Sequence, residues 1–427
     1  MIKTDATIVE VVNSGLCTGC GACIGLCPKD AIKLVIDSAK GIYLPRLDEQ
    51  RCNKCGICLE ICPGHSVDFA KLNMDIFGKQ PDDMLLGNSI NCYVGHAADY
   101  DIRYNSASGG LVTALLIFAL ENGLIDGALV TKMKEESPLE PQPFIARTRA
   151  EIISASKSKY CPVPANIALK EILKNEGKFA VVGLPCHIHA IRKAEMSNKK
   201  LKERITLHLG LFCCGHTDTF LGTEFVLRKY GIAKEDVVHL DYRGEGWPGY
   251  VTIILRNGTR KLIHLNDYII YHNFGFFSPP RCALCYDGIN DLADISLGDA
   301  WLPEFKGDDI GTSLVISRTN SGEALLQKTI EKGILKLRSI DQSKVRHMDQ
   351  KKVACSMKLR LGRFLGRKSP QYNIKLPRPG FAFPPPPLFY LCMSLSSRRF
   401  WWLIKPLAKP LVISLTLGTK CMAVLRR

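Results

Sequence analysis

The sequence predicts an α+β chain in three parts: a small cysteine-rich domain over residues 1–75, a mixed α/β domain over 88–345 and a basic tail over 351–427. Three observations lead to this division. A cysteine motif occurs twice near the N-terminus, and helix and strand patterns alternate through the middle of the chain. The last 77 residues hold 16 Lys and Arg and no Asp or Glu. With 46% hydrophobic and 23% charged residues, the 427-residue chain has the composition of a globular protein.

The N-terminal domain carries two copies of the motif, and the second copy follows the first after 35 residues. The first copy contains Cys17, Cys20, Cys23 and Cys27, and the second contains Cys52, Cys55, Cys58 and Cys62. A proline follows the last cysteine of each copy. Residues 31–37 and 41–44, between the copies, have the apolar character of short strands. Each half is therefore expected to be a small unit of strand and cysteine loop.

The spacing Cys-x2-Cys-x2-Cys-x3-Cys-Pro is that of bacterial two-cluster ferredoxins, in which the fourth cysteine binds the neighbouring 4Fe-4S cluster. It predicts one cluster on Cys17, Cys20, Cys23 and Cys62, and another on Cys52, Cys55, Cys58 and Cys27. The alternative is a pair of structural zinc sites. Zinc requires neither a third cysteine at matching spacing nor the Cys-Pro, and the pattern occurs twice. We therefore predict a two-cluster ferredoxin-like domain.

The cysteine content also indicates the compartment. The chain has 18 cysteines, and its start has no apolar segment of the kind that directs secretion. In a reducing compartment, closely spaced cysteines are typical of metal or redox sites and not of disulfides. We therefore expect a cytoplasmic protein with redox chemistry.

The central domain is predicted to mix helices and strands. An apolar stretch after Gly110 is long enough for a helix over 111–120. Apolar runs predict strands over 124–131, 179–182 and 205–212, and the second of these leads through Gly183-Leu-Pro-Cys186 into a helix. Residues 250–265 have the pattern of a hairpin around an Asn-Gly turn, and 294–301 that of a strand and turn.

A second metal-type pattern lies in this domain. Cys282 and Cys285 form a Cys-x2-Cys pair in a polar loop, and Cys186 and Cys213 each follow a predicted strand. Loops behind separate strands can converge at one end of a sheet, so these four residues are the predicted ligands of a third 4Fe-4S cluster. Cys214 is an alternative to Cys213, because adjacent strand residues point to opposite faces. A structural zinc site and a merely buried cysteine pair compete with the cluster interpretation.

The glycine-containing loops suggest anion binding. Neither a Walker A motif nor Gly-x-Gly-x-x-Gly follows a predicted strand. Ser106, Ser108, Gly109 and Gly110 stand at a predicted helix start, where backbone amides and hydroxyls can hold a phosphate. A plain N-cap with turn glycines is an equal alternative.

Several loops, in this order, resemble the beta subunit of the coenzyme F420 (deazaflavin) hydrogenases and their dehydrogenase relatives, over about residues 90 to 330. The resemblance lies in Ser106–Gly110, Ser158–Tyr160, Gly183–Cys186, Phe212-Cys213, Tyr242–Gly249, Arg281–Cys285 and Ala293–Trp301. A ferredoxin segment in front is a familiar fusion in that family. The resemblance implies a mixed α/β flavin-binding domain and a further 4Fe-4S cluster on the same four cysteines.

The resemblance further implies an FAD among these loops and hydride exchange between flavin and an organic substrate. The implied flavin contacts are Ser106, Ser108, Gly109, Gly110, Ser158, Lys159, Tyr160 and Arg243. Arg243, Lys159 and His187 are candidates for holding anionic groups. His187 stands where better-known members have Gln, so the role of that Gln is not transferred.

The leading hypothesis is an iron–sulfur flavoprotein oxidoreductase that moves electrons between a ferredoxin-type partner and an organic substrate through 4Fe-4S clusters and FAD. The alternative is a non-enzymatic electron-transfer subunit that feeds a partner enzyme, which would need no flavin. No residue stands out as a proton donor. We expect an electron-carrier protein or a small redox substrate as partner. A nucleic acid is not expected, because the tail accounts for the whole net charge of +16.

The tail combines Pro384–Pro387 with a basic aromatic segment that includes Arg398, Trp401 and Lys405. No apolar run reaches the ~18 residues that a spanning helix needs. The combination predicts binding to an anionic membrane surface, with packing on the protein's own body or on an acidic partner as the alternative.

Overall fold

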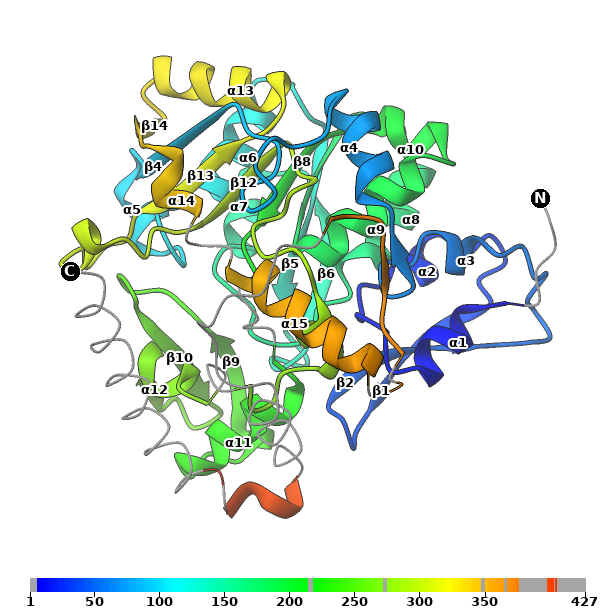
Figure 1. Ribbon diagram of the computed structural model, residues 1–427. Coiled ribbons are helices and arrows are strands. Elements are labelled where there is room, and N and C mark those ends of the chain that lie inside the picture. The colour runs from blue at the N-terminus through cyan, green and yellow to red at the C-terminus, as the bar shows by residue number, and fades with distance from the viewer. Residues whose placement is uncertain are drawn as a thin grey trace.

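The structure is a computed structural model. It describes residues 6–213, 218–271, 275–346, 350–364, 366, 368–375, 398–402 and 404. Figure 1 shows the N-terminal domain in blue at one side, the large central sheet above and a smaller green subdomain below. The orange helix α15 crosses the front between them (Figure 1).

The N-terminal domain consists of short elements around the cysteine loops. Its helices and strands are α1 (Ile8–Asn13), α2 (Ala22–Gly25), β1 (Ile32–Asp37), β2 (Ile42–Leu47), α3 (Ile57–Glu60), β3 (Ser66–Val67) and α4 (Phe69–Phe77). Both predicted strands are confirmed: β1 and β2 pair antiparallel, and β2 is longer than expected. The helices α2 and α3 each begin after a glycine of the motif, Gly21 and Gly56, whose φ angles of 83° and 78° favour glycine.

The core of the central domain is an eight-stranded mixed sheet in the order β14-β4-β13-β12-β8-β7-β5-β6. The strands are β4 (Asn91–Ala97), β5 (Gly127–Met133), β6 (Pro141–Ala146), β7 (Phe179–Gly183), β8 (Ile205–Leu211), β12 (Ile295–Asp299), β13 (Ser313–Ser317) and β14 (Leu335–Ser339). The neighbours β5, β7, β8 and β12 run parallel. Strands predicted over 124–131, 179–182 and 205–212 are confirmed as β5, β7 and β8, although β5 begins at Gly127.

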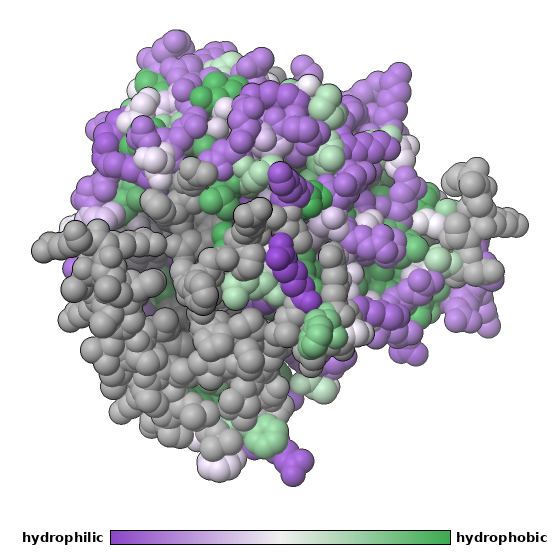
Figure 2. Space-filling model, in the orientation of Figure 1, coloured by the Kyte–Doolittle hydropathy of each residue, from purple (hydrophilic) through white to green (hydrophobic). Residues whose placement is uncertain are grey.

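Helices cover both faces of this sheet. The longer segments are α5 (Tyr100–Tyr104), α6 (Leu111–Glu121), α7 (Arg149–Ser154), α8 (Leu169–Lys174), α9 (Pro185–Glu195), α10 (Lys199–Arg204), α13 (Asn320–Glu331) and α14 (Gln342–Arg346). The predicted helix over 111–120 is confirmed as α6, which is apolar on nearly every side because it is buried almost completely. Figure 2 shows hydrophilic side chains over the described surface around α13.

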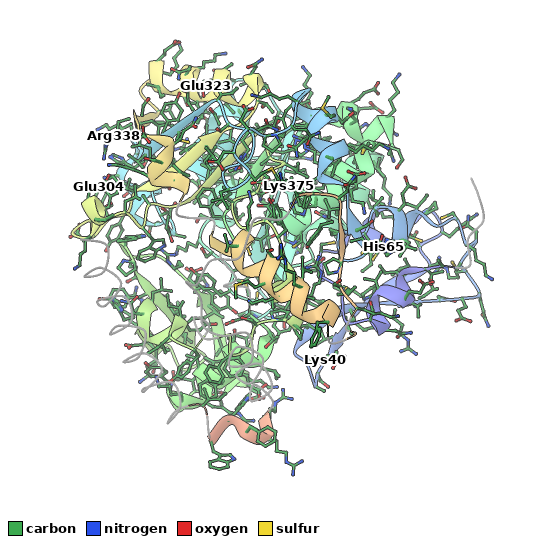
Figure 3. All side chains as sticks on the ribbon, viewed as in Figure 1. Lys40, His65, Glu304, Glu323, Arg338 and Lys375 are labelled. Carbon is green, nitrogen blue, oxygen red and sulfur yellow. The ribbon has the colours of Figure 1, made fainter. Side chains whose placement is uncertain are left out.

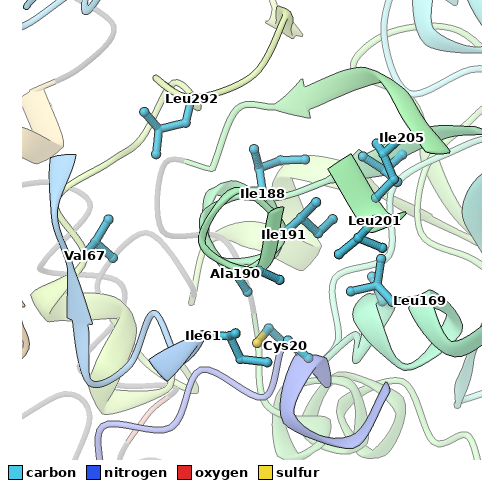
Figure 4. Close-up of a cluster of buried hydrophobic side chains, with 14 of the residues drawn as sticks. Cys20, Ile61, Val67, Leu169, Ile188, Ala190, Ile191, Leu201, Ile205 and Leu292 are labelled. Carbon is cyan, nitrogen blue, oxygen red and sulfur yellow. The ribbon is translucent and has the colours of Figure 1, made fainter. Parts of the chain in front are cut away.

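On one face of the sheet, helix α9 packs against the N-terminal domain. Figure 4 shows α9, with Ile188, Ala190 and Ile191, lying above Cys20 and Ile61 of the cysteine loops. These residues belong to one buried cluster that continues into α8 and α10. The two domains therefore share a hydrophobic core, and the cysteine loops are held rigidly against the central domain.

The smaller subdomain contains the three-stranded sheet β11-β10-β9. Its elements are α11 (Phe220–Lys229), β9 (Val237–Asp241), β10 (Tyr250–Leu255), β11 (Arg260–His264) and α12 (Leu265–Ile269). The predicted hairpin is confirmed as β10 and β11, which pair antiparallel around Asn257-Gly258. The core of the subdomain is rich in aromatic residues, among them Phe225, Tyr242 and Tyr268.

The folded body continues beyond the boundary predicted at residue 351. Helix α15 (Gln350–Phe364) packs against the loop of Cys282, and strand β15 (Gln371–Tyr372) pairs parallel with β3 of the N-terminal domain. This part of the predicted tail is folded because Lys352 and Tyr372 reach buried partners far away in the sequence.

The described end of the chain lies on the smaller subdomain. Arg398 pairs with Glu224 at 2.6 Å, and the Trp401 ring packs edge-on against Phe225 at 5.5 Å. The segment Pro384–Pro387 and Lys405 lie outside the described residues. Among the residues that are described, no helix has both the length and the apolar character that crossing a membrane requires.

Figure 3 places the labelled side chains of Glu304, Glu323 and Arg338 near the edge of the view. Glu304 and Arg338 face each other at one edge, 4.0 Å apart, on the side opposite His65 of the N-terminal domain (Figure 3). An exposed pair of this kind contributes little to stability, on the order of 0–1 kcal/mol. The buried ionic groups described below are energetically more important.

Candidate metal centres and cofactor loops

The eight cysteines of the repeat divide into two sets by position. The inner set, Cys17, Cys20, Cys23 and Cys62, lines one cavity. The outer set, Cys27, Cys52, Cys55 and Cys58, lines a second cavity. Each set combines three cysteines from one copy of the motif with the last cysteine of the other copy. The structure thus brings the thiols together in the grouping that the repeat predicts.

The thiols are arranged around a volume and not around a point. Among the described residues, no three His, Cys, Asp or Glu side chains converge closely enough to hold a single metal ion. Four thiols that surround a cavity suit a cluster whose corners bind separate thiolates. Equivalent backbone amides of the two copies, those of Gly19 and Lys54, donate to Cys17 Sγ and Cys52 Sγ at 3.4 Å. This arrangement fits 4Fe-4S clusters better than the zinc alternative.

Burial determines the protonation of the inner thiols. It raises the pKa of Cys17 to about 12 and that of Cys62 to about 11, so without a cation both thiols stay protonated near neutral pH. A protonated thiol is a poor nucleophile, which counts against a dithiol exchange site. A metal would deprotonate these thiols on binding.

The central set consists of Cys186, Cys213, Cys282 and Cys285. Cys186 lies in the first turn of α9 just behind β7, and Cys213 follows β8, the parallel neighbour of β7. The pair Cys282 and Cys285 lies in and beside the short helix η4 (Pro280–Leu284). The Cys186 thiol interacts electrostatically with the other three thiols. Loops behind separate strands therefore converge as predicted, while the alternative Cys214 lies outside the described residues.

The inner and central sets are neighbours. The Cys186 thiol also interacts with the thiol of Cys20 in the inner set, and burial raises the pKa of Cys186 well above its ordinary value. The backbone N–H of Asn166 donates to the Cys20 carbonyl at 3.0 Å. A Cβ at Gly21 would lie 2.8 Å from the Pro164 carbonyl, so this contact needs glycine. The inner set is consequently fixed beside the central one.

Two cations border the inner set, the buried Arg281 and the partly buried Lys193, and the sequence patterns predicted a role for neither. Lys193 of α9 donates to the carbonyls of Cys62 and Ser66 at 2.9 and 2.6 Å, and burial lowers its pKa to about 8. Arg281 is 4% exposed, and its Nε and Nη1 find no hydrogen-bond acceptor among the described residues. Buried N–H groups of a cation are costly unless an anionic group receives them. Anionic clusters on the adjacent thiols would fit this requirement.

Arg243 joins four loops that the sequence singled out separately. Its guanidinium is 2% exposed and donates from Nη1 to Tyr160 Oη and Asp299 Oδ2, both at 3.1 Å, and from Nη2 to the Ala107 carbonyl. The carboxylate of Asp299 raises the pKa of Arg243 further, so the side chain stays charged. Its Nε has no partner among the described residues and is available to an anionic ligand.

Two aromatic residues extend this region toward solvent. Trp247 follows Arg243 by four residues and packs on Trp301, which follows Asp299 by two, with ring centroids 4.4 Å apart. Trp301 is 49% exposed. Their faces offer a stacking surface for a planar ring beside the buried arginine.

The loop Ser106–Gly110 is anchored by its own polar groups. Ser106 Oγ donates to the Ile102 carbonyl at 2.6 Å, and Ser108 Oγ donates to the Thr312 carbonyl at 3.0 Å. The N–H of Gly109 donates to Ser313 Oγ at 2.9 Å. A Cβ at Gly109 would lie 2.6 Å from the Gly95 carbonyl, so this glycine allows close packing on β4. Of the predicted phosphate donors, the Ser106 and Ser108 hydroxyls and the Gly109 N–H thus have partners within the chain.

Lys159 and His187, which were candidates for binding an anion, form hydrogen bonds with nearby backbone groups instead. Lys159 Nζ, beside Ser158, donates to the carbonyls of Ala155, Ser156 and Lys157, and burial lowers its pKa to about 8. His187 donates from Nε2 to the Val163 carbonyl at 2.9 Å and accepts at Nδ1 from the Leu184 N–H. Burial lowers the pKa of His187 to about 4, so it is neutral and fully bonded. Our prediction that His187 holds an anion is wrong for this reason.

Known proteins match the chain in both of its main parts. Residues 16–66 match the family model of a 4Fe-4S dicluster domain. Residues 92–170 and 176–343 match the N-terminal and C-terminal models of the coenzyme F420 hydrogenase/dehydrogenase beta subunit.

Two named proteins and one solved structure are also similar to this chain. Coenzyme F420 hydrogenase subunit beta of Methanococcus voltae is 30% identical over 268 residues, 61% of this chain and 88% of that protein. Coenzyme F420-dependent sulfite reductase of Methanocaldococcus jannaschii is 29% identical over 345 residues, 74% of this chain and 46% of that protein. A chain of the solved F420-reducing NiFe hydrogenase complex from Methanosarcina barkeri shares the fold, with a TM-score of 0.54 and 24% identity. That likeness covers 68% of this chain and 98% of that one.

Proposed function

Because this chain belongs to the coenzyme F420 hydrogenase/dehydrogenase beta-subunit family and carries a 4Fe-4S dicluster domain, we propose that it is an iron–sulfur flavoprotein oxidoreductase. Its N-terminal domain would exchange single electrons with a partner protein, and its central domain would exchange hydride with an organic substrate. The observation that carries the proposal is that thiols of the inner set interact with both other sets, Cys23 with Cys58 of the outer set and Cys20 with Cys186 of the central set.

The proposed metal ligands are the three cysteine sets. The inner and outer sets would each hold a 4Fe-4S cluster, and the central set a third. The cavities lined by four thiols and the unsatisfied N–H groups of Arg281 support this assignment. The clusters would supply one-electron steps and the flavin the two-electron step. The chain's own contribution is to bury the thiols, to place amide donors at their sulfurs and to exclude water.

The proposed flavin site lies around Arg243. Its unpartnered, buried Nε supports a role in holding an anionic group of FAD, with Tyr160 and the backbone at Ala107 fixing the guanidinium. The loop Ser106–Gly110 would form a wall of the site through its anchored backbone, and Ser158 and Lys159 would hold the neighbouring loop in shape. Trp247 and Trp301 are suited to contact a planar ring system.

Cofactor content tests the proposal directly. Anaerobically purified full-length chain is expected to contain about twelve irons, no zinc and one FAD, since three 4Fe-4S clusters need four irons each. Metal analysis and the flavin absorbance of the released cofactor would measure this. About eight irons would remove the third cluster. Full iron without flavin would favour the alternative of an electron-transfer subunit.

Cross-ligation within the repeat makes a separate prediction. Cys62→Ala is expected to remove the cluster of Cys17, Cys20 and Cys23 and to spare the outer set, because Cys62 lines the inner cavity. About four of twelve irons would be lost. The matched control is Cys92→Ala, which changes a buried cysteine of β4 that belongs to none of the three sets. Electron paramagnetic resonance of the reduced proteins would contradict the assignment if the outer cluster alone disappeared.

A partner protein is part of the proposal, since relatives are subunits of a hydrogenase complex. Peripheral membrane binding of the tail stays a prediction. In the described residues, Arg398 and Trp401 contact Glu224 and Phe225 of the chain itself, which supports the alternative of packing on the body.

A further inference from the structure

We infer that Arg281 is a cation shared by the inner and central cysteine sets, and that it sets the reduction potentials of both clusters together. The inference rests on the proposed clusters and deepens that proposal by assigning a positioning residue between two of them. Arg281 binds no iron itself. Its role would be electrostatic.

The position of Arg281 gives it access to both ligand loops. It directly precedes Cys282, a member of the central set. Its Nη2 donates to the carbonyl of Pro63 at 3.1 Å, and Pro63 directly follows Cys62 of the inner set. The guanidinium interacts electrostatically with the thiols of Cys282, Cys285 and Cys17. One side chain therefore faces thiols of both sets.

The energetics require an anion beside Arg281. The side chain is 4% exposed, and among the described residues its hydrogen-bond acceptors, Pro63 O and Tyr372 Oη, are neutral. In the described part of the chain, the groups with the largest electrostatic effect on Arg281 are Tyr372 and the thiols of Cys285 and Cys282, and no carboxylate is among them. Burying a guanidinium without a counter-charge costs several kcal/mol. Nε and Nη1 have no acceptor there either, so negatively charged clusters on both sides would supply the missing partner.

A neighbouring cation provides the contrast. Lys193 interacts with the thiols of Cys62 and Cys20, both of the inner set, and donates to the carbonyls of Cys62 and Ser66. Lys193 therefore interacts with thiols of the inner set, whereas Arg281 interacts with thiols of both the inner and the central set.

A shared cation has a definite electrostatic consequence. The potential of an iron–sulfur cluster depends on nearby charge and on hydrogen bonds to its sulfurs. A positive charge favours the reduced state, which is the more negative one, and raises the potential. Removing a charge shared by two clusters lowers both potentials, and removing a charge beside one cluster lowers that potential alone. The shared cation would therefore raise the potentials of both clusters together.

The test uses the full-length chain with three variants. Arg281→Gln removes the charge but keeps an N–H donor, Arg281→Lys keeps the charge, and Lys193→Gln removes the contrasting charge. Potentiometric titration followed by electron paramagnetic resonance would measure the midpoint potential of each cluster. The signals are assigned with Cys62→Ala and Cys186→Ser, which remove the inner and the central cluster respectively.

We expect Arg281→Gln to shift the midpoint potentials of the inner and central clusters to more negative values. Lys193→Gln should shift the inner cluster alone, and Arg281→Lys should leave both near wild type. The outer cluster serves as an internal reference in every variant. If Arg281→Gln loses iron from both sets while Arg281→Lys keeps it, both sets require the charge and the inference stands.

Unchanged potentials in an Arg281→Gln protein with all of its iron would overturn the inference. A shift, or a loss of iron, confined to one set would also overturn it, because the cation would then not be shared. Failure of the proposed function looks different: the wild-type chain would itself hold about eight irons, and no central signal would exist to titrate.

Discussion

Arg243→Met is expected to yield a protein that keeps all of its iron but loses its flavin on gel filtration. Arg243 is a buried cation whose Nε has no partner among the described residues, and its side chain joins its own loop to three others. Removing one partner of a buried charged hydrogen bond costs roughly 2–5 kcal/mol of binding free energy. Since about 1.4 kcal/mol is a factor of ten, the affinity for FAD should fall by at least about 30-fold.

Controls distinguish loss of the ligand contact from loss of the fold. Arg256→Met changes an exposed arginine at the end of the β10–β11 hairpin and should leave the flavin bound. Arg243→Met combined with Asp299→Asn removes the partner that the single change would leave as a partly buried, unpaired carboxylate. The double variant should be as stable as wild type and still lack FAD. Normal flavin content in Arg243→Met would show that the flavin is held elsewhere.

The structure also changes how the flavin site should be tested. The helix start predicts an anion contact at Gly109, and the family resemblance implies that the anion belongs to FAD. Any side chain at Gly109 would meet the Gly95 carbonyl and Ser313. A Gly109→Asp protein would therefore combine a packing defect in β4 and β13 with any effect on a phosphate. Arg243 is the sharper position, because its hydrogen bonds are made by a side chain that can be shortened.

Local sequence patterns were sufficient for the elements that position the metal sites. The spacing of Cys17 to Cys62 predicts both thiol groupings, because both copies have the pattern in which the fourth cysteine joins the three cysteines of the other copy. Strand β7 and the turn at Cys186 were predicted because a continuous apolar run ending in Gly-Leu-Pro is typical of a buried parallel strand followed by a helix.

Interactions between distant parts of the chain could not be predicted in this way. Tyr372 reaches Arg281 across 91 residues of sequence, and β15 pairs with β3 across about 305 residues. No local pattern marks such pairs. The roles of Lys159 and His187 depended on which backbone carbonyls lay within reach after folding. Arg281 carried one signal that could have been used, since it is a cation directly beside a predicted ligand, Cys282.

The second large prediction concerns Lys352, which lies in the segment that the sequence predicts to be a tail. Lys352 of α15 is fully buried, and its Nζ lies 2.6 Å from Asp291 Oδ2. It also donates to the carbonyls of Met84 and Leu85 at 3.1 and 2.9 Å. Asp291 belongs to the loop that follows Cys285, and Cys355 of the same helix donates to the Leu284 carbonyl. The ion pair of Lys352 therefore holds α15 against the loop that carries Cys282 and Cys285.

Lys352→Met is expected to lower the free energy of unfolding by about 3–5 kcal/mol, because it leaves the buried Asp291 carboxylate without its closest cation. Arg318 remains 3.7 Å from Asp291 but is already bonded to the carbonyls of Leu86, Asn88 and Ile289. Denaturant unfolding under anaerobic conditions would measure the change. The matched control is Lys344→Met, which removes a half-exposed lysine paired with Glu304 and should cost less than about 1 kcal/mol.

A double-variant cycle identifies the cause of this loss. Lys352→Met combined with Asp291→Asn removes both charges, so the double variant should be more stable than Lys352→Met alone. Iron is expected to be lost first from the central set, since the loop of Cys285 is the segment that α15 covers. Additive losses in the cycle would contradict the pairing of Lys352 with Asp291. Equal release of iron from all three sets would show that α15 stabilises the chain as a whole and not the central site.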